Sequence, residues 1–158
     1  MLRGEFIRAD GLVIPNNITQ FGAKTILGAA YAAEAPRFFV GLVEAAPSST
    51  LQIENCAEPT IGVGGYARQE IPRTAIGWPV QGDVNGEPYI ESRWLTWEAS
   101  ADYSRSIRRL MLLAGDSDTL TDITGPVMAL SAALPAPLIV KPATILQERR
   151  FKYRVYLR

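Results

Sequence analysis

The sequence contains no histidine and only one cysteine among its 158 residues. Without histidine, the chain has no Ser-His-Asp or Cys-His catalytic arrangement and no histidine-ligated zinc. The single Cys56 cannot form a disulfide within the chain, which is typical of a reducing compartment. We do not expect Cys56 to act as a nucleophile, because no histidine is present to activate it. The residues that the common catalytic mechanisms use are therefore lacking, so we expect a protein that is not an enzyme.

A net charge and a long apolar run are also missing. Sixteen Lys and Arg balance sixteen Asp and Glu, so no overall field draws the protein toward nucleic acid or an anionic membrane. The longest weakly polar stretch, residues 125–140, is interrupted by three prolines and is too short to span a membrane. Residues 1–5 lack the apolar run of a signal peptide, so we expect neither secretion nor membrane association.

The composition that is present suits a globular domain, with 47% hydrophobic and 20% charged residues. A chain of this length can bury a core as one domain. We expect residues 16–158 to form a single β-rich domain. Residues 1–15 are expected to be an extended N-terminal arm that becomes ordered on assembly, although residues 2–8 could instead form a short strand.

One helix is expected, over about residues 18–33. Asn17 and Thr19 offer capping oxygens before a stretch in which apolar residues recur at helical spacing. Gly22 and Gly28 weaken this helix, and Pro36 ends it.

The remainder of the chain favours strands. Residues 38–45 form a near-continuous apolar run, as expected of a strand buried on both faces, and residues 151–157 alternate strictly between apolar and polar. Residues 104–114 fit either a helix or a strand, and their length and neighbours favour a strand. Further strands are expected at 51–53, 66–71, 89–97, 127–134 and 138–140, with loops or turns at 47–64, 81–88 and 115–118. The sequence therefore predicts a mainly β fold, an antiparallel β-sandwich or barrel-like domain with one N-terminal helix.

A glycine-rich segment at residues 62–67 matches the loose dinucleotide pattern G-x-G-x-x-A. That pattern needs a strand before it and a helix after it, so that phosphate meets a helix N-terminus. Here a polar loop precedes the glycines, and an extended segment with Pro72 follows. We interpret the segment as a turn or bulge before a strand, and we expect no cofactor.

Two acidic clusters could hold a calcium ion through carboxylate oxygens. One contains Asp116, Asp118 and Asp122, and the other contains Asp83 and Glu87. The spacing of an EF-hand is absent from both. Turn chemistry, in which Asp accepts a hydrogen bond from nearby backbone, is the favoured interpretation over a metal site.

Glu91 and Glu98 flank Trp94 and Trp97, an arrangement that suggests glycoside hydrolysis. Seven positions apart on one strand, the two carboxylates point to opposite faces, so we expect salt-bridged surface positions rather than a catalytic pair. Together with Trp78, the two tryptophans could also form a platform that stacks against sugar. A carbohydrate-binding module therefore remains an alternative, although burial of Trp94 in the core is favoured.

The last ten residues carry five cations and no acid: Arg149, Arg150, Lys152, Arg154 and Arg158. Such a face could contact phosphates. A solvated face, or one paired with acidic residues of a neighbouring subunit, is favoured, and we expect no nucleic acid partner.

The stretch over residues 37–78 carries a resemblance to a known family. It contains Phe39-Val40-Gly41-Leu42, Pro47, Glu58, Gly64-Gly65-Tyr66-Ala67-Arg68-Gln69 and Trp78, and it is preceded by Ile18-Thr19-Gln20-Phe21-Gly22. This pattern resembles that of a group of small phage virion structural proteins. The resemblance covers residues 16–80, and the chain departs from the pattern after Trp78.

The resemblance implies a non-enzymatic protein of the virion, assembled in the host cytoplasm. Within that class it favours a capsid cement or decoration protein, a homotrimer on the head surface that binds and stabilises the lattice of the major capsid protein. A tail, baseplate or fibre-associated component is the alternative. It implies no catalytic, cofactor-binding or metal-binding residues.

Overall fold

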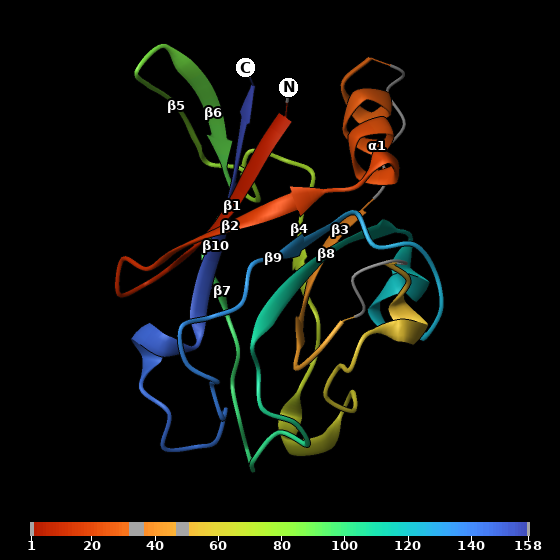
Figure 1. Cartoon of the computed structure of the whole chain (residues 1–158), viewed down its shortest axis with the longest axis vertical. Helices are drawn as coiled ribbons and strands as arrows, with labels where there is room; N and C mark the ends of the chain where they lie inside the picture. The colour runs from red at the N-terminus through yellow and green to blue at the C-terminus, as the bar shows by residue number, and fades with distance from the viewer. Residues whose placement is uncertain (1, 32–36, 47–50, 158) are drawn as a thin grey trace.

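A computed structural model describes residues 2–31, 37–46 and 51–157. In these residues a single antiparallel sheet of ten strands curls into a half-barrel, and one α-helix lies at the end where the two termini emerge (Figure 1). Along the sheet the order is β4-β3-β8-β9-β2-β1-β10-β6-β5, and β7 pairs with β10 outside this path. The expectation of a mainly β, barrel-like domain with one helix is confirmed.

The elements have the following bounds. The strands are β1 (Leu2–Arg8), β2 (Val13–Ile18), β3 (Arg37–Val43), β4 (Gln69–Ile71), β5 (Val80–Val84), β6 (Glu87–Glu91), β7 (Leu95–Thr96), β8 (Arg109–Gly115), β9 (Ala129–Ser131) and β10 (Arg150–Leu157). The helix is α1 (Gln20–Tyr31), and short 3-10 helices are η1 (Ile53–Asn55), η2 (Val63–Gly65), η3 (Ser117–Leu120) and η4 (Leu146–Glu148).

The first strand lies in the middle of the sheet. β1 pairs with β10 over its whole length, from Leu2 opposite Leu157 to Arg8 opposite Phe151, and its other edge pairs with β2. The expectation of an extended arm over residues 1–15 is therefore wrong for the described part of that range. Its physical reason is the side chain of Phe6, which is fully buried in the interior core and ties β1 to the domain.

β3 is buried on both faces, as its apolar run predicts. Phe38, Val40 and Leu42 contribute to the interior core of the half-barrel. Phe39 and Val43 point the opposite way into a second core. Segments that follow β3 and β8 cover this outer core, so the middle of the sheet is shielded from water on both sides.

The two ends of the sheet differ. β4 lies beside β7 without pairing with it. Side chains bridge this gap: Trp97 Nε1 donates to Ala67 O at 3.0 Å, and Arg93 Nη2 donates to Glu70 O at 2.9 Å. The β4 end is thus closed by side-chain hydrogen bonds, whereas β5 lies at the outer end of the strand order.

Strands β5 and β6 form a hairpin over the stretch where a loop or turn at residues 81–88 was expected. Asn85 and Gly86 have φ angles of 53° and 82°, the left-handed pair of a type I′ turn. The turn residues of this stretch therefore occupy only two positions, and the flanking residues pair from Val80 opposite Glu91 to Val84 opposite Glu87. The expected turn is therefore present, but it is confined to Asn85 and Gly86, and the flanking residues form strands because the Asn-Gly signal specifies a tight hairpin.

Helix α1 begins where Thr19 caps it. The backbone N–H of Gly22 donates to Thr19 Oγ1 at 3.0 Å, and that hydroxyl in turn donates to Met128 O at 2.9 Å. Ile18 belongs to β2, so the helix starts later than the expected residue 18. Residues 32 and 33, where its end was expected, lie outside the described residues. No helix among the described residues is long and apolar enough to cross a membrane.

Several strands are shorter than the sequence predicts. The strand expected over 89–97 is broken into β6 and β7, and those expected over 66–71 and 127–134 are reduced to β4 and β9. The short ones at 51–53 and 138–140 are single bridges, Gln52 with Pro126 and Ile107 with Leu138. β8 confirms the strand interpretation for residues 109–114, whereas residues 104–108 precede the strand. The breaks coincide with places where a hydroxyl side chain replaces a backbone partner, as when Leu110 N donates to Ser131 Oγ.

We expect Leu42→Ala to lower the free energy of unfolding by about 2–5 kcal/mol, because the side chain is 1% exposed and its removal leaves a cavity. Urea denaturation measures the change. Ile123→Ala is the matched control: that side chain is 76% exposed, and the expected change is within about 0.5 kcal/mol. Equal losses in both variants would contradict the assignment of Leu42 to the core.

Candidate functional site

Residues that carry the family resemblance meet in one buried cluster. Arg68 and Glu58 form a bidentate pair, with Nε to Oε1 at 2.9 Å and Nη2 to Oε2 at 2.7 Å. The hydroxyl of Tyr66 donates to Glu58 Oε1 at 2.6 Å and accepts from the backbone N–H of Leu42 at 3.0 Å. Gly41 leaves room for this arrangement, because a Cβ there would lie 3.0 Å from the same Glu58 oxygen. Five residues of the pattern thus belong to one packed polar cluster, whereas Pro47 lies outside the described residues.

The cluster ties three segments together. Arg68 Nη1 also donates to Thr119 O in η3 at 2.5 Å, and the Arg68 side chain is only 1% exposed. Burial, together with the charge of Glu58, raises the pKa of Tyr66 well above its ordinary value. The phenol thus stays protonated and keeps donating to the carboxylate. We assign this cluster a structural role, because its groups are satisfied by one another.

The glycine-rich segment forms the turn that leads into this cluster. Gly62, Gly64 and Gly65 all have positive φ, and η2 is followed by extended backbone at Tyr66 rather than by an α-helix. The interpretation as a turn is confirmed. The helix N-terminus that a dinucleotide site requires does not follow it.

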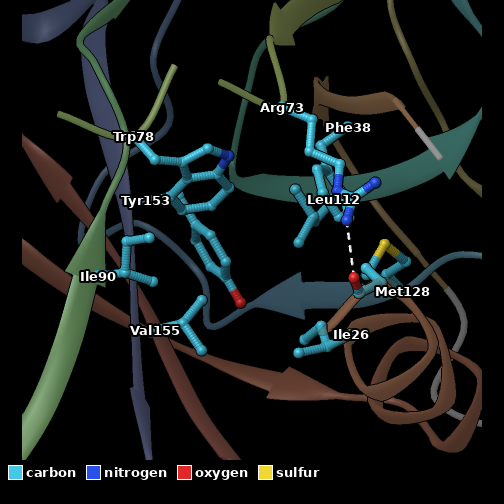
Figure 2. A pocket seen from close by; sticks show the side chains of 10 residues that line it. Ile26, Phe38, Arg73, Trp78, Ile90, Leu112, Met128, Tyr153 and Val155 are labelled. Carbon is cyan, nitrogen blue, oxygen red and sulfur yellow. Dashed lines mark hydrogen bonds between the residues drawn. The ribbon is translucent and has the colours of Figure 1, made fainter. Parts of the chain in front are cut away.

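An apolar cavity of about 260 Å³ lies between α1 and the concave face of the sheet (Figure 2). Ile26 reaches it from the helix, and Trp78, Ile90 and Tyr153 line the side formed by β6, β10 and the segment before β5. Arg73 stands at this cavity and donates from Nη2 to the helix carbonyl of Ala29 at 2.7 Å. The cavity combines an apolar lining with one cation, which is the kind of site that takes a small molecule.

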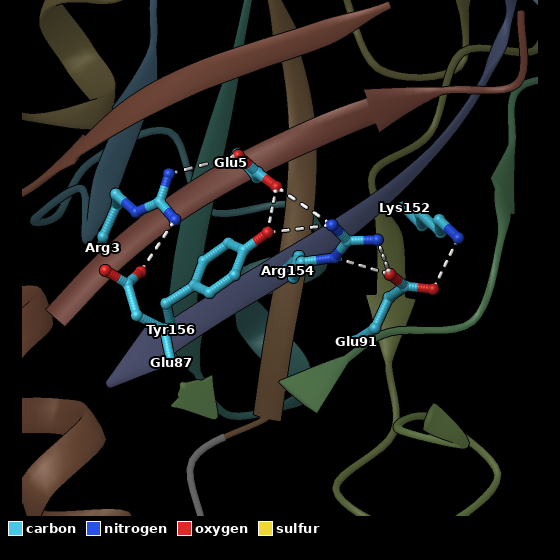
Figure 3. A network of polar contacts seen from close by, with 7 residues as sticks. All are labelled: Arg3, Glu5, Glu87, Glu91, Lys152, Arg154 and Tyr156. Atoms are coloured by element: carbon cyan, nitrogen blue, oxygen red, sulfur yellow. Dashed lines mark hydrogen bonds and ion pairs between the residues drawn. The ribbon is translucent and has the colours of Figure 1, made fainter. Parts of the chain in front are cut away.

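A second polar network covers the opposite face of β1, β10 and β6 (Figure 3). Glu5, Arg154 and Glu91 lie directly opposite one another on these three strands. Arg154 Nε donates to Glu91 Oε2 at 2.7 Å, and Arg154 Nη1 lies 3.3 Å from Glu5 Oε1. Tyr156 donates to the same Glu5 oxygen at 2.8 Å, and Lys152 Nζ donates to Glu91 Oε1 at 2.5 Å. Alternating charges on neighbouring strands therefore neutralise one another.

Glu91 is a buried member of this network, not the surface residue that the sequence predicted. Its side chain is 4% exposed, whereas the side chain of Glu98 is 78% exposed and pairs with Arg149 at 3.0 Å. Burial raises the pKa of Glu91, but hydrogen bonds from Lys152 and Arg154 outweigh burial, so the net pKa lies below its ordinary value. Glu91 is thus a charged partner for two cations, while Glu98 confirms the surface salt bridge.

Most cations of the last strand are engaged within the chain. Lys152 and Arg154 pair with Glu91, Arg149 pairs with Glu98, and Arg150 lies over the ring of Trp94 at 5.3 Å. Arg158 lies outside the described residues. The acids that were expected from a neighbouring subunit are supplied by the same chain. These side chains are therefore already engaged within the chain, whereas contacts to phosphate would require them to be available.

The three tryptophans serve different parts of the fold. Trp97 is fully buried, so it cannot stack against a sugar at the surface. Trp94 lies beneath the cations of Arg150 and Lys152, and Trp78 packs edge-on to Phe38 beside the cavity. Trp94 is only partly buried, so its expected place in the core is wrong.

The acidic turns behave as turn chemistry predicts. Asp116 Oδ1 accepts from the backbone N–H of Asp118 at 2.9 Å, and Asp83 Oδ1 accepts from Gly86 N at 3.0 Å. Over the described residues no three Cys, Asp or Glu side chains gather as a metal site, and Asp122 joins no such group. The self-bonded turn interpretation is confirmed for Asp116 and Asp83.

Cys56 is partly buried and lies near acidic side chains. Burial, with the charges of Glu58 and Glu54, raises the pKa of its thiol to about 11. Its Sγ lies 3.4 Å from Gln52 O. The thiol therefore stays protonated at neutral pH, which makes it a poor nucleophile.

The sequence did not indicate that residues would come together to form the cavity or either of the two polar networks. For the outer network a signal was present, because Arg3 and Glu5 alternate on β1 as Lys152 and Arg154 do on β10. No local pattern pointed to the cavity, whose lining comes from segments far apart in the chain. None of the protein-family models, curated proteins or solved structures compared with the chain matches it.

We expect Arg68→Met to lower the free energy of unfolding by about 3–5 kcal/mol, because it leaves the Glu58 carboxylate buried without its cation. Thermal and urea denaturation measure the loss. Arg105→Met, which removes the exposed partner of Glu44, is the control and should change stability by about 1 kcal/mol or less. A double variant Arg68→Met/Glu58→Met should be more stable than Arg68→Met alone, and a further loss would argue against a coupled pair.

We expect the outer network to make stability depend on pH through Glu91. Its pKa is lowered on folding, so its contribution is complete above the unfolded value of about 4.3 and is lost as the pH falls through the lower folded pKa. Glu91→Gln should therefore be less stable than the parent at pH 7, and the difference should shrink at pH 3. Denaturation at both pH values checks this, with the exposed Glu98→Gln as control. A difference that is the same at both pH values would contradict the assignment.

Proposed function

We propose that the protein is a non-enzymatic structural protein of a phage virion, a cement or decoration protein that binds the lattice of the major capsid protein. Its resemblance over residues 16–80 supports the virion class. The observation that carries the proposal is the hairpin β5–β6, which extends from the body of the domain with one edge of β5 facing outward (Figure 1). A protein whose work is to make contacts needs such an unpaired surface.

The outer edge of β5 offers backbone groups to a partner strand. In a two-residue hairpin, the residues next to the turn, Val84 and Glu87, form a hydrogen-bonded pair. Because hydrogen-bonded and non-bonded positions alternate, Gln81 and Asp83 direct their backbone N–H and C=O groups away from β6. An extended segment of the capsid lattice can therefore pair there.

This edge lacks the usual protection against strand addition. β5 reads Val-Gln-Gly-Asp-Val and contains neither lysine nor proline. The carboxylate of Asp83 already accepts a hydrogen bond from the backbone N–H of Gly86 in the turn. Val80 and Val84 are 38% and 39% exposed, and Ile76 in the preceding loop is 75% exposed. Apolar side chains thus flank the free backbone, as an interface core requires.

The hairpin is held firmly to the domain. On β6, Glu91 is anchored by Lys152 and Arg154, and Tyr89 packs against Tyr156 with ring centroids 5.6 Å apart. The ring of Tyr89 also covers Gly82 of β5, leaving no room for a side chain there. A pre-organised edge loses little conformational entropy on binding.

We expect purified protein to cosediment with expanded capsids that lack it, and Gln81→Pro to weaken this binding by about tenfold or more. Proline removes one outward N–H without touching the bonds between β5 and β6. Gln81→Ala keeps that N–H and serves as the matched control, with unchanged binding expected. Binding to tail tubes but not to capsids would overturn the cement assignment, and equal binding of both variants would overturn the role of the edge.

A further inference from the structure

The cavity beneath α1 continues into a second apolar hollow. The second hollow has a volume of about 310 Å³ and shares Ile26, Ile90 and Val155 with the first. Beyond these shared residues it is lined by the ends of β1, β10 and β6, including Leu2 and Leu157. The two hollows adjoin at these three side chains, and together they are called the apolar track between the helix and the sheet. Its volume lies in the range of sites that enclose small molecules.

The two ends of this track differ in charge. Arg73 stands at the first hollow, where its guanidinium donates to Ala29 O, and no carboxylate of a described residue lies within ion-pair distance of it. Arg37, on the neighbouring strand β3, is by contrast matched to the carboxylate of Glu70. The lining of the second hollow contains no charged side chain. The track is therefore cationic at one end and apolar along its remaining length.

One residue that lines the first hollow, Tyr153, has a buried polar partner (Figure 2 shows the Tyr153 side chain). Its hydroxyl accepts from Asn16 Nδ2 at 3.0 Å. Asn16 is 91% buried, and its Oδ1 has no hydrogen-bond partner among the described residues. Gly4 leaves the space that both polar atoms occupy, since a Cβ there would collide with them. The unpartnered amide oxygen is an acceptor and offers no hydrogen bond to an ionised carboxylate, so among the groups at the first hollow Arg73 is the one that suits an anionic head group.

We propose that this track binds an aliphatic carboxylate, with its head group on Arg73 and its chain along Ile26, Ile90 and Val155 toward Leu157. A guanidinium binds a carboxylate through paired charge-assisted hydrogen bonds, which gives the head group its place. The apolar lining removes the methylene chain from water, which supplies affinity. This site is separate from the outer edge of β5 and does not depend on the capsid role.

Dodecanoate is the probe that tests the site. Titration of the full chain, followed by calorimetry and by tryptophan fluorescence, should show saturable binding of one molecule. Trp78 lines the first hollow, so Trp78→Phe should remove most of the fluorescence change while heat is still released. Dodecanol, which has the same chain without the charge, should bind at least about tenfold more weakly.

Two variants separate the head group from the chain. Arg73→Gln, at an exposed position, should weaken dodecanoate binding about tenfold, whereas Lys141→Gln removes the same charge elsewhere on the surface and should leave it unchanged. Ile26→Trp should fill the track and abolish binding of both probes, with folding checked by circular dichroism. If Ile26→Trp fails to fold, the comparison of dodecanoate affinity between Arg73→Gln and Lys141→Gln is sufficient to test the proposal.

Several outcomes would overturn the proposal. These are no saturable binding, equal affinity for dodecanol and dodecanoate, or equal affinity in the Arg73→Gln and parent proteins. Dissociation of a dimer on addition of dodecanoate would also overturn it, because the track would then be a contact between two copies of the chain. Loss of capsid binding in Gln81→Pro with dodecanoate binding intact would show that the two sites are independent.

Discussion

The pairing of β1 with β10 joins the two halves of the sheet, and the rest of the fold depends on it. On one side of this pair lie β2, β9, β8, β3 and β4, and on the other lie β6, β5 and β7. The interior core that spans both halves therefore requires the first and last strands of the chain to pair. Phe6 and Tyr153 stack across the junction with ring centroids 4.8 Å apart, and Glu5 lies opposite Arg154 on the other face. Such a contact between distant parts of the chain makes folding slow relative to local pairing, because a long loop must close first.

Side chains complete the sheet where its backbone ladder stops. Tyr66 bonds Leu42 N beyond the end of β4, Ser92 Oγ accepts from Tyr153 N between β6 and β7, and Ser131 Oγ accepts from Leu110 N. Each buried amide would otherwise lose a hydrogen bond, which costs more than a typical bond contributes. Strands can thus be short without leaving unsatisfied backbone, and the sheet can curl strongly. The Arg68 and Glu58 pair also replaces backbone pairing with side-chain hydrogen bonds, and it fastens two irregular segments to η3.

Sequence patterns identified the elements whose secondary structure follows from the local periodicity of their side chains. The apolar run of β3 predicted burial on both faces, and the alternation of β10 predicted a strand, because both depend on side-chain periodicity alone. The same alternation failed at Tyr156, which is 3% exposed on the face expected to be polar. Burial there comes from Arg3, whose guanidinium lies 4.0 Å from the ring centroid and belongs to the opposite end of the chain. The place of β1 was missed for the same reason, since polar residues such as Arg3 and Glu5 make it look like a solvated arm until their partners on β10 are known.

Some polar and apolar groups of this fold have partners within the chain and others do not, and this difference is the physical basis of the proposed binding sites. Lys152 and Arg154 of β10, like Arg68 beside Glu58, are occupied by partners in the same chain, so they hold the domain in shape. The outer edge of β5 and the apolar track under α1 retain bonding capacity toward other molecules. Both lie at the end of the domain where the termini and α1 are found (Figure 1). β6 contributes Ile90 to the track and also pairs with β5, so one strand adjoins both places. The two places nevertheless use different chemistry, since the edge offers backbone hydrogen bonds and the track offers an apolar lining with one cation, so each is assigned by its own kind of ligand.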